Sequence, residues 1–149
     1  MATDYIVYKR SRFSTRLPTD RVYAASHFWI LRQDQEVCRI GFTKFAVRFL
    51  GEPVEFDVEV GRDERVETGQ VIGWLEGFKA VTDLYCPMSG VFAGVNPALA
   101  ERIENVRTHP YEGGWLYEVC GSAGADCMSA EKYVELLNRT IDTMTGRGA

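Results

Sequence analysis

Residues 71–86 read VIGWLEGFKAVTDLYC, and the fold class can be inferred from this segment outward. Two short runs rich in β-branched, aromatic and other apolar residues flank the segment Glu76-Gly77-Phe78-Lys79-Ala80. We predict a strand over 70–76, a turn, and a second strand over 80–86, because such runs bounded by glycine and proline are typical of strands. This pattern places Lys79 at the tip of a hairpin.

The same strand pattern continues on both sides of this hairpin. Residues 54–60 alternate apolar and acidic side chains at a period of two, as a half-buried strand does, and Gly61 ends the run. Short strands with a turn signal roughly every 8–12 residues predict a mainly β sandwich or barrel, here over residues 27–120. Further strands are expected at 91–95 and 115–120, and in an opening hairpin at 27–31 and 37–40.

Helices are expected only at the periphery of this β region. Residues 43–50 begin with Thr43 as a candidate N-cap, carry apolar residues at helical spacing, and precede a glycine. A second short helix is expected over 97–105. The clearest helical pattern is C-terminal: Ser129 is a candidate N-cap, and one apolar stripe runs to Met144. We expect this stripe to dock on the same domain.

Length and composition indicate one ordinary globular domain. The chain has 149 residues, of which 46% are hydrophobic and 26% are charged, with no apolar run long enough to span a membrane. The formal charge of −4 argues against a dedicated nucleic-acid binder, which needs a concentrated basic surface. The charge is uneven, however. Residues 1–22 hold five Lys or Arg and two Asp, a balance of 5 − 2 = +3, which leaves −7 for the remainder.

The four cysteines, Cys38, Cys86, Cys120 and Cys127, are widely spaced and form no C-x-x-C pair. With only two histidines in the chain, this spacing gives no support to a zinc or iron–sulfur site. A secretory signal pattern is also lacking, so we expect a cytoplasmic protein with reduced thiols.

A lysine at a hairpin tip is usually a solvated charge without a task. The setting of Lys79 differs, because an acid lies three residues before it, an alanine follows it, and strands flank it on both sides. This segment resembles the lipoyl-attachment hairpin of lipoyl carrier domains, and is most similar to that of the glycine cleavage H-protein family. Biotin carriers place methionines beside their lysine, whereas this chain has Phe78 and Ala80, so lipoate is the better match.

The resemblance extends over about residues 23–121. It implies a lipoyl-domain fold, a barrel-sandwich hybrid of two small antiparallel sheets with short peripheral helices. It also implies a division of the chain into a basic N-terminal extension (1–22), a lipoyl-carrier domain (23–121), and a C-terminal helix (122–149). The matching motifs are His27-x-Trp29, Val37-x-x-Ile40-Gly41-Phe42-Thr43, Leu50-Gly51, Glu76-x-x-Lys79-Ala80, Pro87-x-Ser89-Gly90, Val95-Asn96 and His109-Pro110-Tyr111-Glu112-Gly113-Gly114-Trp115-Leu116.

By this resemblance, Lys79 bears covalent lipoate and the chain is a substrate of partner enzymes, without catalytic residues of its own. Acylation removes the charge of the lysine amine and adds an arm that ends in a strained cyclic disulfide. Gly77 is expected to allow a tight backbone at the tip. Glu76 is either a solvated acid or a recognition point for the lipoylating enzyme, which would be a lipoate ligase, or an octanoyltransferase acting with lipoyl synthase.

Two residues depart from the family pattern where its cleft for the loaded arm is expected. Phe28 stands where the family typically has Glu, and Phe49 where it commonly has His. Two phenyl rings hold a cationic aminomethyl cargo poorly, although Phe49 has the plainer interpretation of filling the core face of a helix. Cys86 and Cys120 are candidate reactive thiols, and a buried, inert role is the plainer interpretation for Cys120.

Together with the basic extension, these departures resemble the H-like lipoate-binding proteins of heterodisulfide-reductase-like sulfur oxidation. The main hypothesis is therefore an arm that carries sulfur between a heterodisulfide-reductase-like complex and dihydrolipoamide dehydrogenase. The alternative is an H protein that shuttles an aminomethyl group between glycine decarboxylase and aminomethyltransferase. A second alternative is an unmodified interaction module that keeps the fold without the arm.

Overall fold

Strands make up most of the secondary structure in the computed structural model, which describes residues 3–146. No helix within those residues is long and apolar enough to cross a membrane. The elements are β1 (Tyr5–Arg10), β2 (Phe13–Pro18), β3 (Val22–Tyr23), β4 (Phe28–Arg32), β5 (Val37–Phe42), α1 (Lys44–Leu50), β6 (Pro53–Val58), β7 (Arg65–Val66), β8 (Val71–Gly77), β9 (Val81–Tyr85), β10 (Gly90–Val95), the 3₁₀ helix η1 (Pro97–Ala100), α2 (Asn105–Thr108), β11 (Tyr117–Cys120) and α3 (Ala130–Thr145).

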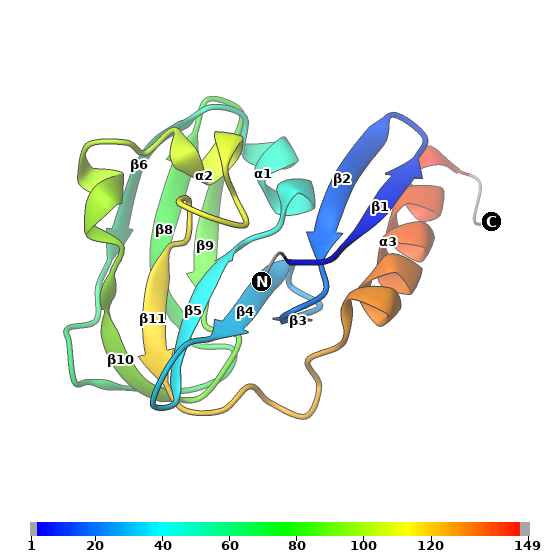
Figure 1. Cartoon of the computed structure of the whole chain (residues 1–149). Helices are drawn as coiled ribbons and strands as arrows, with labels where there is room; N and C mark the ends of the chain where they lie inside the picture. Colours follow the sequence, from blue (N-terminus) through cyan, green and yellow to red (C-terminus); the bar gives the residue numbers. More distant parts are fainter. Residues whose placement is uncertain (1–2, 147–149) are drawn as a thin grey trace.

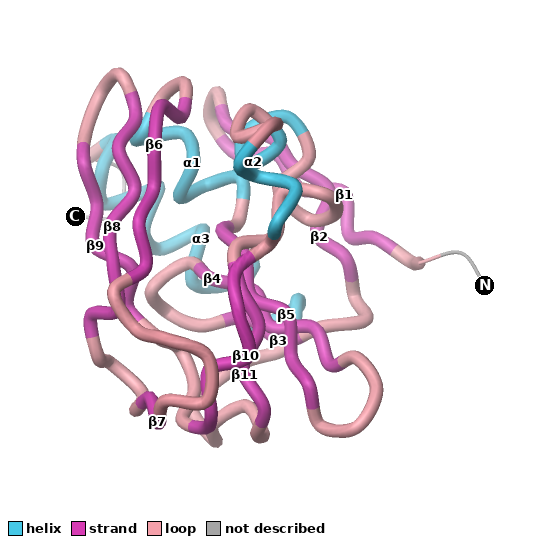
Figure 2. Tube along the Cα trace, turned by 90° about the vertical axis from the view of Figure 1, so that its left-hand side faces the viewer, coloured by secondary structure: helices cyan, strands magenta, loops and turns pink. Residues whose placement is uncertain are grey.

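Two antiparallel sheets enclose the main core. One has the strand order β3-β4-β5-β11-β10-β7 and the other the order β6-β8-β9. In Figure 2 the three-stranded sheet lies to the left of strands β4, β5, β10 and β11. Fully buried side chains from both sheets, such as Ile40 of β5, Leu75 of β8 and Val119 of β11, belong to one hydrophobic cluster. The mainly β, lipoyl-domain-like fold predicted from the strand pattern and the family resemblance is therefore confirmed.

A second hydrophobic cluster joins the two ends of the chain. The hairpin β1–β2 lies beside α3 (Figure 1), and Leu17 of β2 and Leu137 of α3 are both fully buried in this cluster. Arg10 of β1 forms two hydrogen bonds of 2.8 and 2.7 Å with the carboxylate of Asp142. The N-terminal hairpin is thus part of the packed structure through residues distant in sequence.

The helices and strands of the structure agree with those predicted from the sequence in most places, with three differences. Thr43 caps α1 and Ser129 caps α3, as their hydroxyl side chains predict. No strand was expected over 5–18, where the structure has β1 and β2. The segment 97–105 is not one helix, because η1 ends at Ala100 and α2 begins only at Asn105. The short strands β3 and β7 were also not predicted.

Candidate functional site

Lys79 lies in the three-residue connection between β8 and β9, and its side chain is exposed. The backbone N–H of Gly77 donates to the carbonyl of Ala80 at 2.8 Å, which closes the hairpin. Its neighbour Phe78 is 78% exposed. The lysine is therefore presented at the surface by two strands whose inner faces are packed in the core.

The hairpin tip is fastened to the end of α1. The N–H of Lys79 donates to the carbonyl of Leu50, and the N–H of Phe78 to that of Glu52, both at 2.9 Å. A Cβ on Gly77 would lie 2.1 Å from the Leu50 oxygen, so this close approach requires glycine. Gly51 has φ +72° and a Cβ there would lie 2.9 Å from Cγ of Lys79, which shows that the lysine stem crosses over this residue.

Glu76 is half-buried at the end of β8, three residues before the lysine. In the strand registers it pairs with Val81 on β9 and with Glu55 on β6. The structure thus places Glu76 near the tip, beside a second carboxylate on the neighbouring strand.

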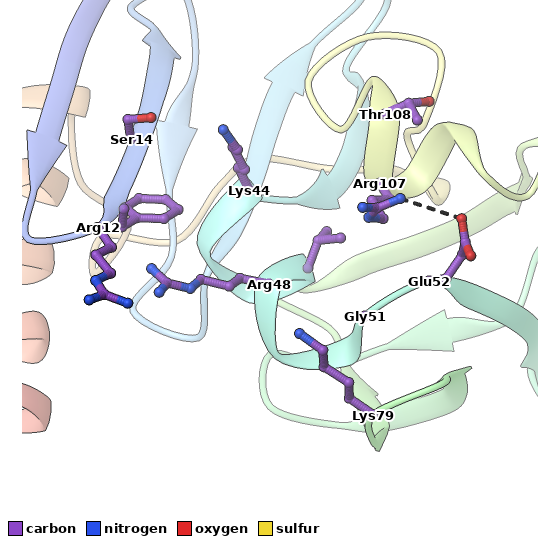
Figure 3. A pocket seen from close by; sticks show the side chains of 11 residues that line it. Arg12, Ser14, Lys44, Arg48, Gly51, Glu52, Lys79, Arg107 and Thr108 are labelled. Atoms are coloured by element: carbon purple, nitrogen blue, oxygen red, sulfur yellow. Dashed lines mark hydrogen bonds and ion pairs between the residues drawn. The ribbon is translucent and has the colours of Figure 1, made fainter.

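One side of the hairpin opens into a groove of about 640 Å³, called the basic groove below. Its lining comes from the β1–β2 turn, α1, α2 and the hairpin tip, and Figure 3 shows the lysine amine pointing toward α1. One ion pair crosses it, between Arg107 and Glu52 at 3.4 Å. The charged residues that line it are Arg12, Lys44, Arg48, Glu52, Lys79 and Arg107.

On another side of the tip lies a smaller hollow of about 410 Å³, called the apolar cleft below, whose lining includes Ala80. Phe28 and Phe49 both line it, the first buried and stacked on Phe42 with ring centroids 4.7 Å apart, the second 44% exposed. His27 also lines it, and the Nδ1 atom of its ring shares a 2.8 Å hydrogen bond with the Tyr133 hydroxyl. Burial lowers the pKa of His27, which favours a neutral imidazole.

The cysteines lie outside the basic groove and the apolar cleft. Cys86 is 1% exposed, its thiol donates to the Met88 carbonyl at 3.0 Å, and burial raises its pKa. Cys120 is half-buried at the end of β11. Within residues 3–146 no group of three or more His, Cys, Asp or Glu side chains is arranged to hold a metal ion.

Comparison with known proteins decides the family. The profile of the family described as "Glycine cleavage H-protein" matches residues 21–140, which is most of the chain. The chain belongs to the glycine cleavage H-protein family. Proteins of this family carry lipoate covalently attached to a lysine. The hairpin β1–β2 precedes the matched residues, so it is an addition to the part of the chain that the family profile covers.

Individual relatives agree with this assignment. The chain is 38% identical over 123 residues to a glycine cleavage system H protein of Corynebacterium jeikeium, and 40% identical over 120 residues to one of Deinococcus radiodurans. Each alignment covers 80% of this chain and 95% of the relative. A crystal structure of the glycine cleavage system H protein from Mycobacterium marinum superposes with a TM-score of 0.73 at 33% identity, covering 82% of this chain and 99% of the other.

The residues around Lys79 fit the group that this family carries. The amine is exposed for acylation, and hollows on two sides of the tip offer an apolar chain and its end group places to lie. Sequence reasoning did not find the basic groove. The sequence feature that pointed toward the groove is the excess of Lys and Arg in residues 1–22. This excess does not show that Arg12 lies near α1 and α2 in space.

Proposed function

We propose that this chain carries lipoate as an amide on Lys79 and passes a covalent intermediate between partner enzymes. The observation that supports this most directly is the hairpin tip, where the lysine backbone is tied to Leu50 while its amine is exposed. A rigid origin and a free side chain suit a group that must visit several active sites from one anchor.

The bound group supplies a strained disulfide that opens by thiol exchange or reductive acylation. The chain's own residues present and shelter it. Gly77 allows the tip to lie against α1, and the Lys79 stem runs across Gly51 toward the basic groove. We assign no catalytic residue to the chain, which acts as a substrate of its partners.

For the cargo, the comparisons favour the aminomethyl group over sulfur, because the relatives described above are glycine cleavage system H proteins. The proposed partners are accordingly glycine decarboxylase, aminomethyltransferase, dihydrolipoamide dehydrogenase, and a lipoylating enzyme. We propose that Glu76 takes part in recognition by that lipoylating enzyme, since it is half-buried close to the lysine.

One observation keeps a sulfur-carrying role as the second candidate. The apolar cleft presents the phenyl rings of Phe28 and Phe49 beside the hairpin. The neutral form of His27, favoured by burial, adds no charge to that surface. The charged side chain in the lining of the cleft is that of Asp83, which is exposed. The phenyl rings themselves offer a cationic cargo little, whereas a sulfur species without a positive charge loses less on packing against them.

Intact mass spectrometry tests the attachment. The protein is produced with lipoate and a lipoate ligase, as wild type, as Lys79→Arg, and as Lys44→Arg, which replaces the other lysine of the basic groove. One lipoyl increment is expected in the wild type and in Lys44→Arg and none in Lys79→Arg, with unchanged circular dichroism. An increment retained in Lys79→Arg contradicts the assignment of the lysine, and none in the wild type supports the unmodified module.

The cargo is tested with the lipoylated protein, glycine decarboxylase and labelled glycine, with the Deinococcus radiodurans relative run in parallel. Formation of a labelled adduct with exchange of bicarbonate, at a rate comparable with the relative, is the expected result. No adduct on this chain alongside a normal reaction of the relative rejects the glycine cargo and favours the sulfur-carrying role.

A further inference from the structure

Apart from Lys79, the cations of the basic groove come from three separate parts of the chain. Arg12 stands in the turn between β1 and β2, Lys44 and Arg48 lie one turn apart on α1, and Arg107 belongs to α2. Figure 3 shows Arg48 extending from α1 toward Arg12, with Lys44 and Arg107 farther along the same groove.

Packing holds the first of these segments in place. Phe13, the residue after Arg12, is 3% exposed and contacts Phe45 of α1 edge to face, with ring centroids 5.3 Å apart. The guanidinium of Arg48 lies over the Phe13 ring at 5.8 Å. The position of Arg12 beside α1 is therefore a consequence of a buried aromatic contact.

The groove has an excess of positive charge. Its lining holds four cations besides Lys79 and one carboxylate, that of Glu52. The net charge of the groove is therefore 4 − 1 = +3 once Lys79 is acylated. Within the described residues 3–146, Arg12, Lys44 and Arg48 form no ion pair with a carboxylate within 4.0 Å. The whole chain carries −4, so this positive region is local. A concave surface of one sign concentrates ions of the opposite sign.

We propose that the basic groove binds an oxyanion carried at the end of the Lys79 arm. This inference rests on lipoylation of Lys79, and not on the glycine or sulfur origin of the cargo. A lipoyl-lysine arm of about ten bonds extends roughly 12 Å, while the seven residues of α1 span roughly 10 Å. An arm that starts across Gly51, at the end of α1, is therefore long enough to span this helix.

The groove and the apolar cleft then sort arm adducts by charge. An anionic end group gains attraction in the groove, while a cationic one is repelled there and is left with the cleft. Chains that lack β1–β2 lack the Arg12 part of this site, since the hairpin precedes the family-matched residues.

Sulfite is the probe for this site. Its sulfur lone pair attacks one sulfur of the lipoyl disulfide, the S–S bond breaks, and the second sulfur leaves as a thiolate, so no oxidant is needed. The product carries a fixed sulfonate. All four cysteines of the protein are free thiols and offer no disulfide to sulfite. Lys79→Arg protein provides the blank.

The measurement is the equilibrium constant of the adduct, obtained by intact mass over a sulfite titration of lipoylated protein. Arg12→Gln and Arg48→Gln are each expected to lower it roughly two- to fivefold, the range of a solvent-exposed ion pair. Arg139→Gln, an exposed arginine on α3 away from the groove, is the matched control and is expected to leave it unchanged. The difference is expected to shrink in 0.5 M salt.

The outcomes separate the two proposals. A protein that is lipoylated and forms the adduct equally well in Arg12→Gln, Arg48→Gln and Arg139→Gln overturns the oxyanion site while leaving the carrier role intact. A protein without the lipoyl increment overturns the carrier role and the oxyanion site with it.

Discussion

The backbone N–H of Lys79 donates a 2.9 Å hydrogen bond to the carbonyl oxygen of Leu50, the last residue of α1. The bond joins the tip of one hairpin to a helix that also borders the basic groove and the apolar cleft. A tip held in this way does not swing with its side chain, so the proposed arm starts from a fixed point between the two hollows.

Replacement of Gly77 by alanine is expected to disturb this junction. The new Cβ would stand 2.1 Å from the Leu50 oxygen, which forces the tip away from α1. We expect a loss of about 1–3 kcal/mol in the free energy of unfolding, as for other overpacked sites, together with slower lipoylation. Urea unfolding and a ligase assay measure the two effects. Gly61→Ala is the control, because a Cβ there meets only a Glu64 oxygen at 3.4 Å, and an equal loss in both variants would contradict the argument.

Substitution of Glu76 by glutamine tests the proposed contact with the lipoylating enzyme. If the Glu76 carboxylate accepts charge-assisted hydrogen bonds from the lipoylating enzyme, its loss is expected to slow lipoylation roughly tenfold or more. Glu55→Gln is the matched control, because the two acids pair across β6 and β8 and removal of either relieves the same repulsion. Lipoylation is expected to slow in Glu76→Gln only. Equal rates in the two variants would leave Glu76 as a solvated acid.

The extent to which the sequence predicted this architecture depends on how local each signal is. The Lys79 hairpin, α1 and α3 follow from short-range periodicity and from caps such as Thr43 and Ser129. Hairpin β1–β2 also carries a period of two, with Phe13, Thr15 and Leu17 facing inward. A threonine in the inward row and the surrounding arginines obscured it.

The excess of Lys and Arg in residues 1–22 does not by itself predict the basic groove. Arg12 and Arg107 are 95 positions apart in the chain and meet one groove only because Phe13 packs on α1 and α2 lies beside it. Likewise, Cys86 is a strand-end residue by its sequence, and its burial beneath the Met88 carbonyl depends on the path of the following turn.

Thiol reactivity follows from this burial. The pKa of the Cys38, Cys86 and Cys127 thiols is raised, mainly by burial, which lowers their thiolate fraction. In native protein at pH 7.5 we expect iodoacetamide to label Cys120 first. Cys38 and Cys86 are expected to react at least about tenfold more slowly than Cys120. Peptide mass spectrometry gives the four rates, and all four are expected to become similar in urea. Rapid native labelling of Cys86 would restore it as a candidate exchange partner for the arm.

His27 is expected to make the protein less stable in mild acid. Its folded pKa lies below the unfolded value of about 6.5 because burial disfavours the charged ring. Between these two values the unfolded chain binds more protons, so the free energy of unfolding falls as the pH falls, by at most about 1.4 kcal/mol per pH unit. Urea unfolding at pH 7.5, 6.5 and 5.5 measures the slope. His27→Gln is expected to reduce this slope, whereas a substitution of the exposed His109, His109→Gln, is not. Equal slopes in the two variants would show that His27 does not cause the loss of stability in acid.

Phe13 provides a test of whether the N-terminal hairpin is an integral part of the domain and of the groove. Its ring is buried between β2 and α1, where it meets Phe45 and lies under the Arg48 guanidinium. Phe13→Leu keeps an apolar side chain but loses these ring contacts and that with Tyr8, so we expect a loss of about 1–3 kcal/mol in the free energy of unfolding. Phe49, which is 44% exposed, provides the control, and Phe49→Leu is expected to cost less.

Because Arg12 adjoins the Phe13 ring, Phe13→Leu is also expected to weaken the sulfite adduct of lipoylated protein. A hairpin that packs independently of the groove would show the stability loss with an unchanged adduct constant.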